Sequence, residues 1–201
     1  MQAEVSLEDI AMSAAFTGYR PGKLPFGYDL SHPDAIRLRE ALMREYINLI
    51  NHGYRFFLTG GALGSDLMAA EVILELKREY PDAKIAHMLC APCYHYTAKW
   101  PGAERERLDK IASKSLVSFI SQTEYYNGCM QKRNRYMVDT SRVLLAVYDG
   151  LPGGTKSTVE YARSKNKKLV IINPRQLMRI ELIESAEDIR LMLTGDDKQY
   201  R

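Results

Sequence analysis

The sequence has few cysteines, one tryptophan and no long apolar run. Three cysteines are an odd number, which fits a reducing compartment better than a disulfide framework. No apolar run approaches the roughly 20 residues that a membrane-spanning helix needs, so we expect a soluble protein without a membrane partner. Residues 1–8 carry acidic side chains and no basic segment before an apolar stretch, which indicates a cytoplasmic location without a secretory signal.

Two common nucleotide-binding signatures are also missing. The segment at residues 17–22 reads Thr-Gly-Tyr-Arg-Pro-Gly instead of G-x-G-x-x-G, and no G-x-x-x-x-G-K-[ST] loop occurs. These absences disfavour an NAD-dependent dehydrogenase and a P-loop ATPase. The formal net charge is only +3, with both signs interspersed, which argues against a dedicated duplex-DNA-binding protein but leaves room for one local basic pocket.

Short apolar runs alternate with amphipathic stretches along the chain. Strands are expected at residues 11–16, 54–58, 84–91, 116–120, 143–148 and 169–172, and helices from Pro33 to Gly53, at 65–80, 103–114 and 130–139, and from the turn at 153–155 to residue 165. Apolar strands separated by helices favour parallel pairing, because crossover helices cover both faces of a parallel sheet. We therefore predict an α/β, Rossmann-like three-layer sandwich with a mostly parallel central sheet.

The length fits a single domain over residues 1–201. We expect its core at about residues 11–173 and a C-terminal helical tail at 174–201, with a helix near 185–193. In the first expected helix, Ile36 is assigned to the apolar face together with Leu42 and Leu49.

Two glycine-rich turns, at residues 60–66 and 150–155, each follow an expected strand and open an expected helix. Glycines let a backbone approach a ligand closely, and the unpaired N–H groups at a helix N-terminus attract anions. Ligands of such sheets bind beyond the carboxyl ends of the strands, where Gly18-Tyr19-Arg20 should also lie. The turns therefore predict a phosphate site, and helix capping is the structural alternative for each.

Several separated motifs resemble, in order, those of the YpsA-type branch of the SLOG superfamily. They are residues 57–66, Trp100-Pro101, residues 125–130, Arg133-Asn134-Arg135 and residues 147–155. The resemblance implies a Rossmann-like fold that binds a nucleotide or a nucleotide-derived, ADP-ribose-like ligand. It does not imply a settled activity.

The chain also resembles the LOG phosphoribohydrolases, which cleave the N-glycosidic bond of nucleoside monophosphates. Residues 152–160 stand at the P-G-G-x-G-T-x-x-E motif of that family, with Lys156-Ser157 in place of the second Gly-Thr. This resemblance implies catalytic roles for Glu160, beside an oxocarbenium-like ribosyl centre, and for Arg133, on the 5′-phosphate. A third similar family, DNA-processing protein A, binds single-stranded DNA. The low net charge and the lack of added domains make nucleic acid an unlikely partner here.

The candidate ligand-binding residues gather at the expected strand ends: Gly18, Arg20, Gly60, Gly61, Gly64, Ser65, Asp66, Asn134, Asp149, Gly153, Gly154 and Thr155. Some have structural alternatives. Asp66, at a helix start, is more often an N-cap than a sugar ligand, and Asn134 can tie down a turn. Arg133 is favoured over Arg135, because residues two apart on a helix do not share a face. Tyr125, Tyr126 and Trp100 can stack on a base or simply pack.

His87, Cys90, Cys93 and His95 are the residue types that hold zinc. His87 and Cys90 fall on opposite faces of one strand, so we expect no metal and no cofactor. A redox C-x-x-C is disfavoured because Pro92 continues into a loop instead of a helix.

The leading functional hypothesis is a signalling or regulatory module that binds a small-molecule nucleotide and forms a homo-oligomer. The alternative is a nucleotide N-glycosidase of the LOG type. A third possibility is an interaction scaffold that uses the fold without a ligand.

Overall fold

The computed structural model describes residues 10–176 and 179–182. Their strands are β1 (Ser13–Gly18), β2 (Phe56–Thr59), β3 (Ala86–Ala91), β4 (Leu116–Phe119), β5 (Val143–Val147), β6 (Lys168–Ile172) and β7 (Arg179–Leu182). They form one sheet in the order β4-β3-β2-β1-β5-β6-β7. The first six strands pair in parallel, and β7 pairs antiparallel with β6. The predicted α/β sandwich with a mostly parallel sheet is confirmed.

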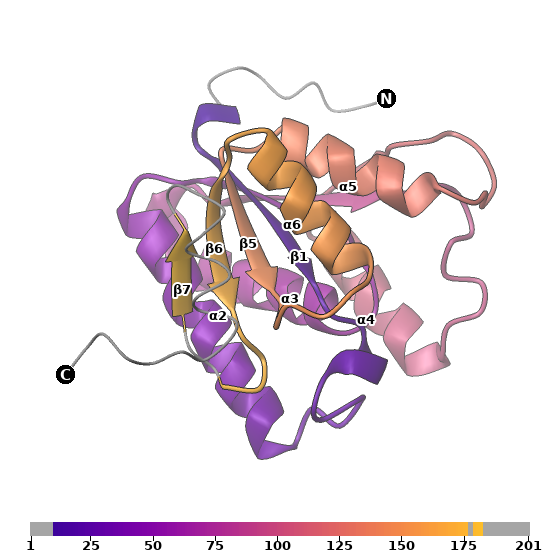
Figure 1. Cartoon of the computed structure of the whole chain (residues 1–201), viewed down its shortest axis with the longest axis horizontal. Coiled ribbons are helices and arrows are strands. Elements are labelled where there is room, and N and C mark those ends of the chain that lie inside the picture. Colours follow the sequence, from indigo (N-terminus) through magenta and orange to yellow (C-terminus); the bar gives the residue numbers. More distant parts are fainter. Residues whose placement is uncertain (1–9, 177–178, 183–201) are drawn as a thin grey trace.

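Helices cover both faces of the sheet (Figure 1). They are α2 (Pro33–Asn51), α3 (Ser65–Glu79), α4 (Gly102–Ala112), α5 (Cys129–Asp139) and α6 (Gly154–Ser164), with short 3-10 turns at Pro21–Lys23 and Pro81–Ala83. Helices α2 and α3 pack together, as do α5 and α6. Every residue of β2 and β5 is buried, as expected for strands covered on both faces.

Helix α2 shows how local sequence sets an element. His32 caps it by accepting the N–H of Asp34, and Pro33 takes the first helical position, where its missing N–H costs nothing. Its buried face includes Leu38, Leu42 and Leu49. The sequence analysis places Ile36 on this face, but Ile36 is 49% exposed. The buried stripe of α2 runs through positions three to four residues apart, such as Leu38 and Leu42, and Ile36 lies off that stripe.

The described part of the tail contains a strand that the sequence analysis did not predict. Residues 179–182 form strand β7. The reversal before it is built around Asn173, whose side-chain oxygen accepts the N–H of Arg175 at 2.9 Å and that of Gln176 at 3.4 Å. This turn sends the chain back along β6 instead of opening a helix. The helix expected near residues 185–193 lies outside the described residues.

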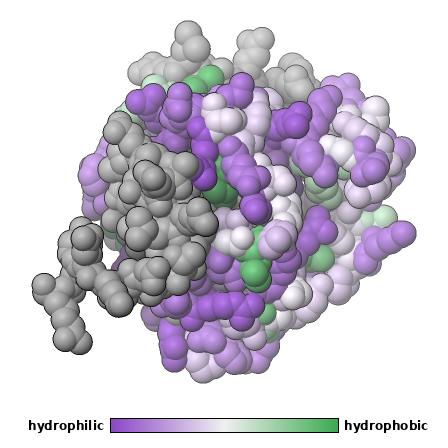
Figure 2. Space-filling view, in the orientation of Figure 1, coloured by the Kyte–Doolittle hydropathy of each residue, from purple (hydrophilic) through white to green (hydrophobic). Residues whose placement is uncertain are grey.

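The surface seen in Figure 2 is mainly hydrophilic, with small, separate hydrophobic areas. Among the residues that the structure describes, no helix combines the length and apolar character needed to cross a membrane.

Candidate functional site

A cavity of about 840 Å³ lies at the end of β1, the strand at which the sheet order reverses, and the start of α6 lines it as well. This is the position at which ligands bind in open α/β sheets. Of the predicted site residues, the cavity is lined by Gly18, Arg20, Asp66, Arg133, Asn134, Gly153, Gly154, Thr155 and Glu160. Gly60, Gly61, Gly64, Ser65 and Asp149 stand outside this lining. Lys23 also lines the cavity, although the sequence analysis did not include it among the site residues. The one feature that could have indicated it is its position, as a basic residue shortly after the first strand.

The first glycine turn is filled by protein groups. The N–H of Ala62 donates to Asp66 Oδ2 at 3.0 Å. The N–H and the hydroxyl of Ser65 both donate to the carbonyl of Tyr19, at 3.1 and 2.9 Å. Two amides and one hydroxyl of this turn are therefore bonded within the molecule.

Packing explains the glycines of this first turn. A Cβ on Gly60 would overlap the Arg133 guanidinium, and one on Gly61 would lie 2.6 Å from Leu89 Cδ1. Gly64 has a φ of +92°, and a Cβ there would lie 2.6 Å from the Tyr19 carbonyl oxygen. These positions require glycine for close approach within the protein.

The second turn is open at Gly154, whereas the Lys23 ammonium lies at Gly153 and donates to the Pro152 carbonyl. Ser157 donates the bond to the carbonyl of Gly153 that begins the ladder of α6, so the amides of Gly154, Thr155 and Lys156 precede it. A Cβ on Gly154 would meet nothing within 4 Å. The Thr155 hydroxyl donates to the Gly18 carbonyl at 3.1 Å and so ties the turn to β1. The second turn therefore has open space at Gly154, in front of amides that precede the helical ladder, whereas Lys23 Nζ lies against Gly153.

Helix α5 connects the two turns. Arg133, 4% exposed, donates from Nη1 to the Gly60 carbonyl and from Nε to Asn134 Oδ1 at 2.7 Å. Asn134 donates to Thr158 Oγ1 at 2.8 Å, and Thr158 donates to the Gly154 carbonyl at 2.9 Å. The Arg-Asn motif therefore fixes the spacing between the turns as well as lining the cavity.

Asp66 is a buried carboxylate on the cavity wall. It lies in the first turn of α3, whose N-cap is Gly64, and it is 5% exposed. Its Oδ2 accepts the Ala62 N–H, whereas Oδ1 has no partner in the described part of the chain. Burial raises the pKa of this carboxyl above its ordinary value, and the positive charge of Arg133 opposes that rise.

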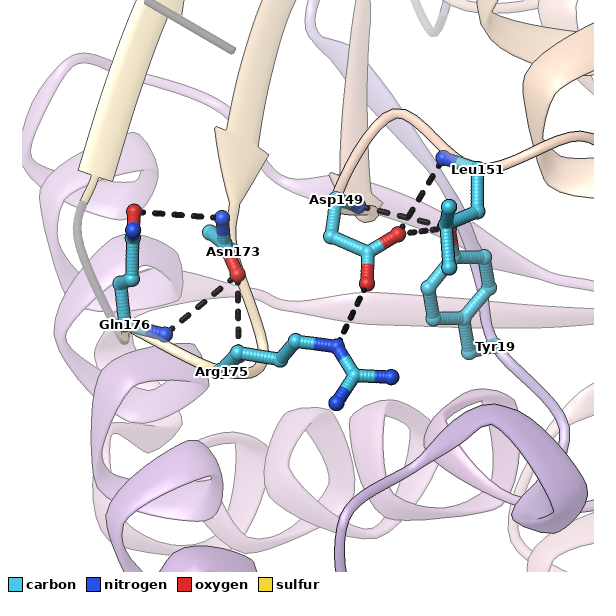
Figure 3. Close-up of polar contacts among 6 residues, drawn as sticks. All are labelled: Tyr19, Asp149, Leu151, Asn173, Arg175 and Gln176. Atoms are coloured by element: carbon cyan, nitrogen blue, oxygen red, sulfur yellow. Dashed lines mark hydrogen bonds and ion pairs between the residues drawn. The ribbon is translucent and has the colours of Figure 1, made fainter. Parts of the chain in front are cut away.

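Asp149 holds the loop before α6 (Figure 3). Its Oδ1 accepts the Tyr19 hydroxyl and the N–H of Leu151, and its Oδ2 accepts Arg175 Nε at 3.0 Å. Burial acts to raise its pKa, but the bonds from Tyr19 and Arg175 outweigh burial, so the pKa is lowered. Asp149 thereby joins the segment after β1 to the turn after β6.

Glu160 lies on the exposed rim of the cavity, with 58% of its side chain exposed. Its carboxylate is 3.7 Å from Lys156 Nζ, one helical turn away. The lysine that replaces glycine in the LOG-type motif is thus paired with the retained glutamate. On the same rim the Arg135 guanidinium lies over the Tyr161 ring, and Tyr125 is 60% exposed.

The zinc-type residues are held by other groups. His87 Nε2 lies 2.9 Å from Thr59 Oγ1, and Nδ1 lies 2.6 Å from Ser115 Oγ. Cys93 Sγ is 3.2 Å from Cys129 Sγ, a contact that no sequence spacing indicated. Within residues 10–176 and 179–182, no group of three metal-ligand side chains occurs.

Comparison with known families identifies the family of this chain. A family model named YpsA, described as the YspA SLOG family, matches residues 14–181. The chain belongs to this YpsA family. It is 34% identical over 156 residues to a UPF0398 protein of Bacillus cereus, covering 76% of this chain and 83% of the relative. A UPF0398 protein of Bacillus thuringiensis is 33% identical over the same length and coverage.

Solved structures with the same fold include DNA processing protein A. The Helicobacter pylori protein, described by its single-stranded DNA binding mode, matches this YpsA-family chain with a TM-score of 0.60 at 19% identity, over 93% of this chain and 74% of that chain. The Streptococcus pneumoniae protein matches with a TM-score of 0.59 at 16% identity. The alignment covers 94% of this chain and 59% of the pneumococcal chain.

The prediction that nucleic acid is an unlikely partner is wrong. It used the net charge of +3 and the lack of added domains, yet a protein with this fold binds single-stranded DNA. Net charge is a sum over the whole protein, whereas a single strand of DNA contacts only one groove of the surface. In this YpsA-family chain Arg20, Lys23 and Arg135 all line the same cavity, which the average conceals.

Proposed function

We propose that the cavity binds a nucleotide or an ADP-ribose-like derivative, with a phosphate at the N-terminus of α6, and that the protein is a signalling or regulatory module. The open space at Gly154 carries this proposal, because it lies in front of the first amides of α6. Arg20 and Lys23 line the same cavity and add positive charge for an anion.

Binding without hydrolysis is better supported than a LOG-type reaction. Arg133 is buried and bonded to Gly60 and Asn134, which limits its use as a phosphate clamp. Glu160 is mostly exposed and ion-paired, whereas stabilising a ribosyl cation needs a positioned carboxylate shielded from water. Incubation with AMP and related nucleotides, followed by chromatography for free base, tests this choice, and released base would favour the hydrolase.

Single-stranded DNA is a second candidate ligand for the same groove. The exposed Tyr125 supports it, because single-strand sites combine aromatic stacking with nearby cations such as Arg135. The Helicobacter pylori protein described above shows that this fold can bind such a strand. Filter binding of oligothymidylate at two salt concentrations tests this candidate.

Gly154→Val provides the test of the phosphate site. The added side chain meets no protein atom near its Cβ but fills the space before the α6 amides. We expect calorimetry to show a loss of affinity for AMP or ADP-ribose of about tenfold or more, since hydrogen bonds to charged groups contribute roughly 1.5–3 kcal/mol. Gly102→Val is the matched control, because Gly102 also begins a helix and also has open space at its Cβ. Equal affinity in the wild type and a folded Gly154→Val protein would place the phosphate elsewhere.

We also propose that the protein is a cytoplasmic homo-oligomer. Light scattering on the purified protein measures its oligomeric state.

A further inference from the structure

An unsatisfied carboxyl oxygen and a weakly bonded guanidinium nitrogen belong to two residues that line the cavity. Asp66 Oδ1 is buried and has no partner among the described residues. Arg133 uses Nη1 and Nε within the protein, while its Nη2 is 3.8 Å from the Met130 thioether, a weak acceptor. The Asp66 carboxyl therefore offers an acceptor, and Arg133 Nη2, bonded only to a thioether, offers a donor.

The two groups influence each other. The positive charge of Arg133 favours the ionised form of the Asp66 carboxyl and so opposes the effect of burial on its pKa. The side chains come from α3 and α5, and both line the cavity whose other side is the N-terminus of α6. Buried polar atoms in folded proteins are usually paired, so a buried acceptor facing a cavity indicates a missing donor.

We infer that Asp66 and Arg133 form an inner subsite for the uncharged part of the ligand, a group with a hydrogen-bond donor next to an acceptor. This inference rests on the proposed function. The vicinal hydroxyls of ribose and the amine-bearing edge of adenine both have this chemistry. A phosphate does not, because its oxygens would face the oxygen of Asp66.

The subsite fixes the orientation of the ligand in the cavity. Its anionic end lies at the amides of α6, and its neutral polar end lies at Asp66. The cavity is thus selective for a phosphate joined to a polar uncharged group, and inorganic pyrophosphate can satisfy only the α6 side.

Calorimetry with four probes tests the inference: AMP, 2′,3′-dideoxy-AMP, purine riboside 5′-monophosphate and pyrophosphate. In the wild type we expect AMP to bind about tenfold more tightly than at least one of the two AMP analogues, as for loss of a hydrogen bond to a charged group. Weaker binding of the dideoxy analogue assigns the subsite to ribose, and weaker binding of purine riboside monophosphate assigns it to the base. This series needs no variant, so it remains decisive if a substitution prevents folding.

Asp66→Asn completes the test. When the amide oxygen accepts the Ala62 N–H, the amide nitrogen faces the cavity and presents a donor in place of an acceptor. We expect weaker AMP binding, loss of discrimination between AMP and the analogue, and unchanged or tighter pyrophosphate binding. Lys132→Ala, exposed on α5, is the control variant.

Three results would overturn the inference. Equal binding of AMP and both analogues by the wild type would show that the subsite contacts neither group. Full discrimination retained by Asp66→Asn would show that Oδ1 is satisfied by water instead of the ligand. If no nucleotide binds the wild type, the proposed function fails and this subsite fails with it, whereas the first two results leave the phosphate site intact.

Discussion

His87 makes the free energy of unfolding depend on pH. Burial, with a smaller effect from Lys77, lowers the pKa of the ring to about 3, so the folded protein holds it neutral. An unfolded histidine titrates near 6.5, and the unfolded chain therefore binds one more proton between about pH 6.5 and 3. Stability due to this group is complete above pH 6.5, and it falls by up to ~1.4 kcal/mol per pH unit as the pH is lowered through that window.

Urea unfolding at pH 7, 6 and 5 measures this effect. We expect the wild type to lose stability steadily, and His87→Gln to lose less over the same range although it starts less stable. His95→Gln is the control, since 78% of the His95 side chain is exposed, and it should follow the wild type. Parallel curves for all three proteins would assign the pH dependence to other groups.

At the residue scale, the sequence could predict which residues gather but not how they bond. The order of strands places Asp66, Arg133 and Gly154 at one cavity, as expected from the strand ends. Whether a glycine serves packing or a ligand depends on contacts between distant residues, such as that of Arg133 with Gly60, 73 positions apart. No local pattern contains that information.

At the scale of elements, α5 sets the distance between the two glycine turns. Asn134→Ala removes the bond to Thr158 and the acceptor for Arg133 Nε. We expect a loss of about 1–3 kcal/mol in the free energy of unfolding, because buried partners are left unsatisfied. Affinity for AMP should also fall, since α5 no longer holds Thr158, whose hydroxyl bonds to the start of α6.

Denaturant unfolding and calorimetry measure the two effects of Asn134→Ala. Lys132→Ala, on the exposed side of the same helix, should alter neither property. A stable Asn134→Ala protein with normal AMP affinity would show that α5 does not position the turns.

The helices and parallel strands could be predicted, because short apolar runs and amphipathic stretches can be recognised in the local sequence. Strand β7 was missed because its four residues, Arg-Ile-Glu-Leu, alternate charged and apolar side chains too briefly to stand out. Its pairing with β6 depends on the turn at Asn173.

At the scale of the whole molecule, β1 lies between strands that follow it at very different distances in the chain. It pairs with β2 about 40 residues later and with β5 about 130 residues later. A fragment of residues 10–128 would therefore leave one edge of β1 unpaired and lack α5 and α6. We expect this fragment to aggregate, because an exposed apolar strand edge is a template for association.

Sedimentation and circular dichroism of the fragment, compared with the full chain, check this expectation. A monomeric fragment that unfolds cooperatively would show that β1 to β4 form a stable unit alone. The strand order itself was only partly predictable: alternation predicts parallel strands, but the position of β1 at the centre results from contacts over long sequence separations.

The packing around Trp100 gives the molecule a built-in optical probe. This residue is the only tryptophan, and its ring meets that of Tyr96 edge to face at 5.6 Å. The Tyr96 hydroxyl donates to the carbonyl of Gly61, which directly precedes the cavity residue Ala62. Through this contact the indole is linked to the first glycine turn, so we expect filling of the cavity to change the intrinsic fluorescence, without an attached dye.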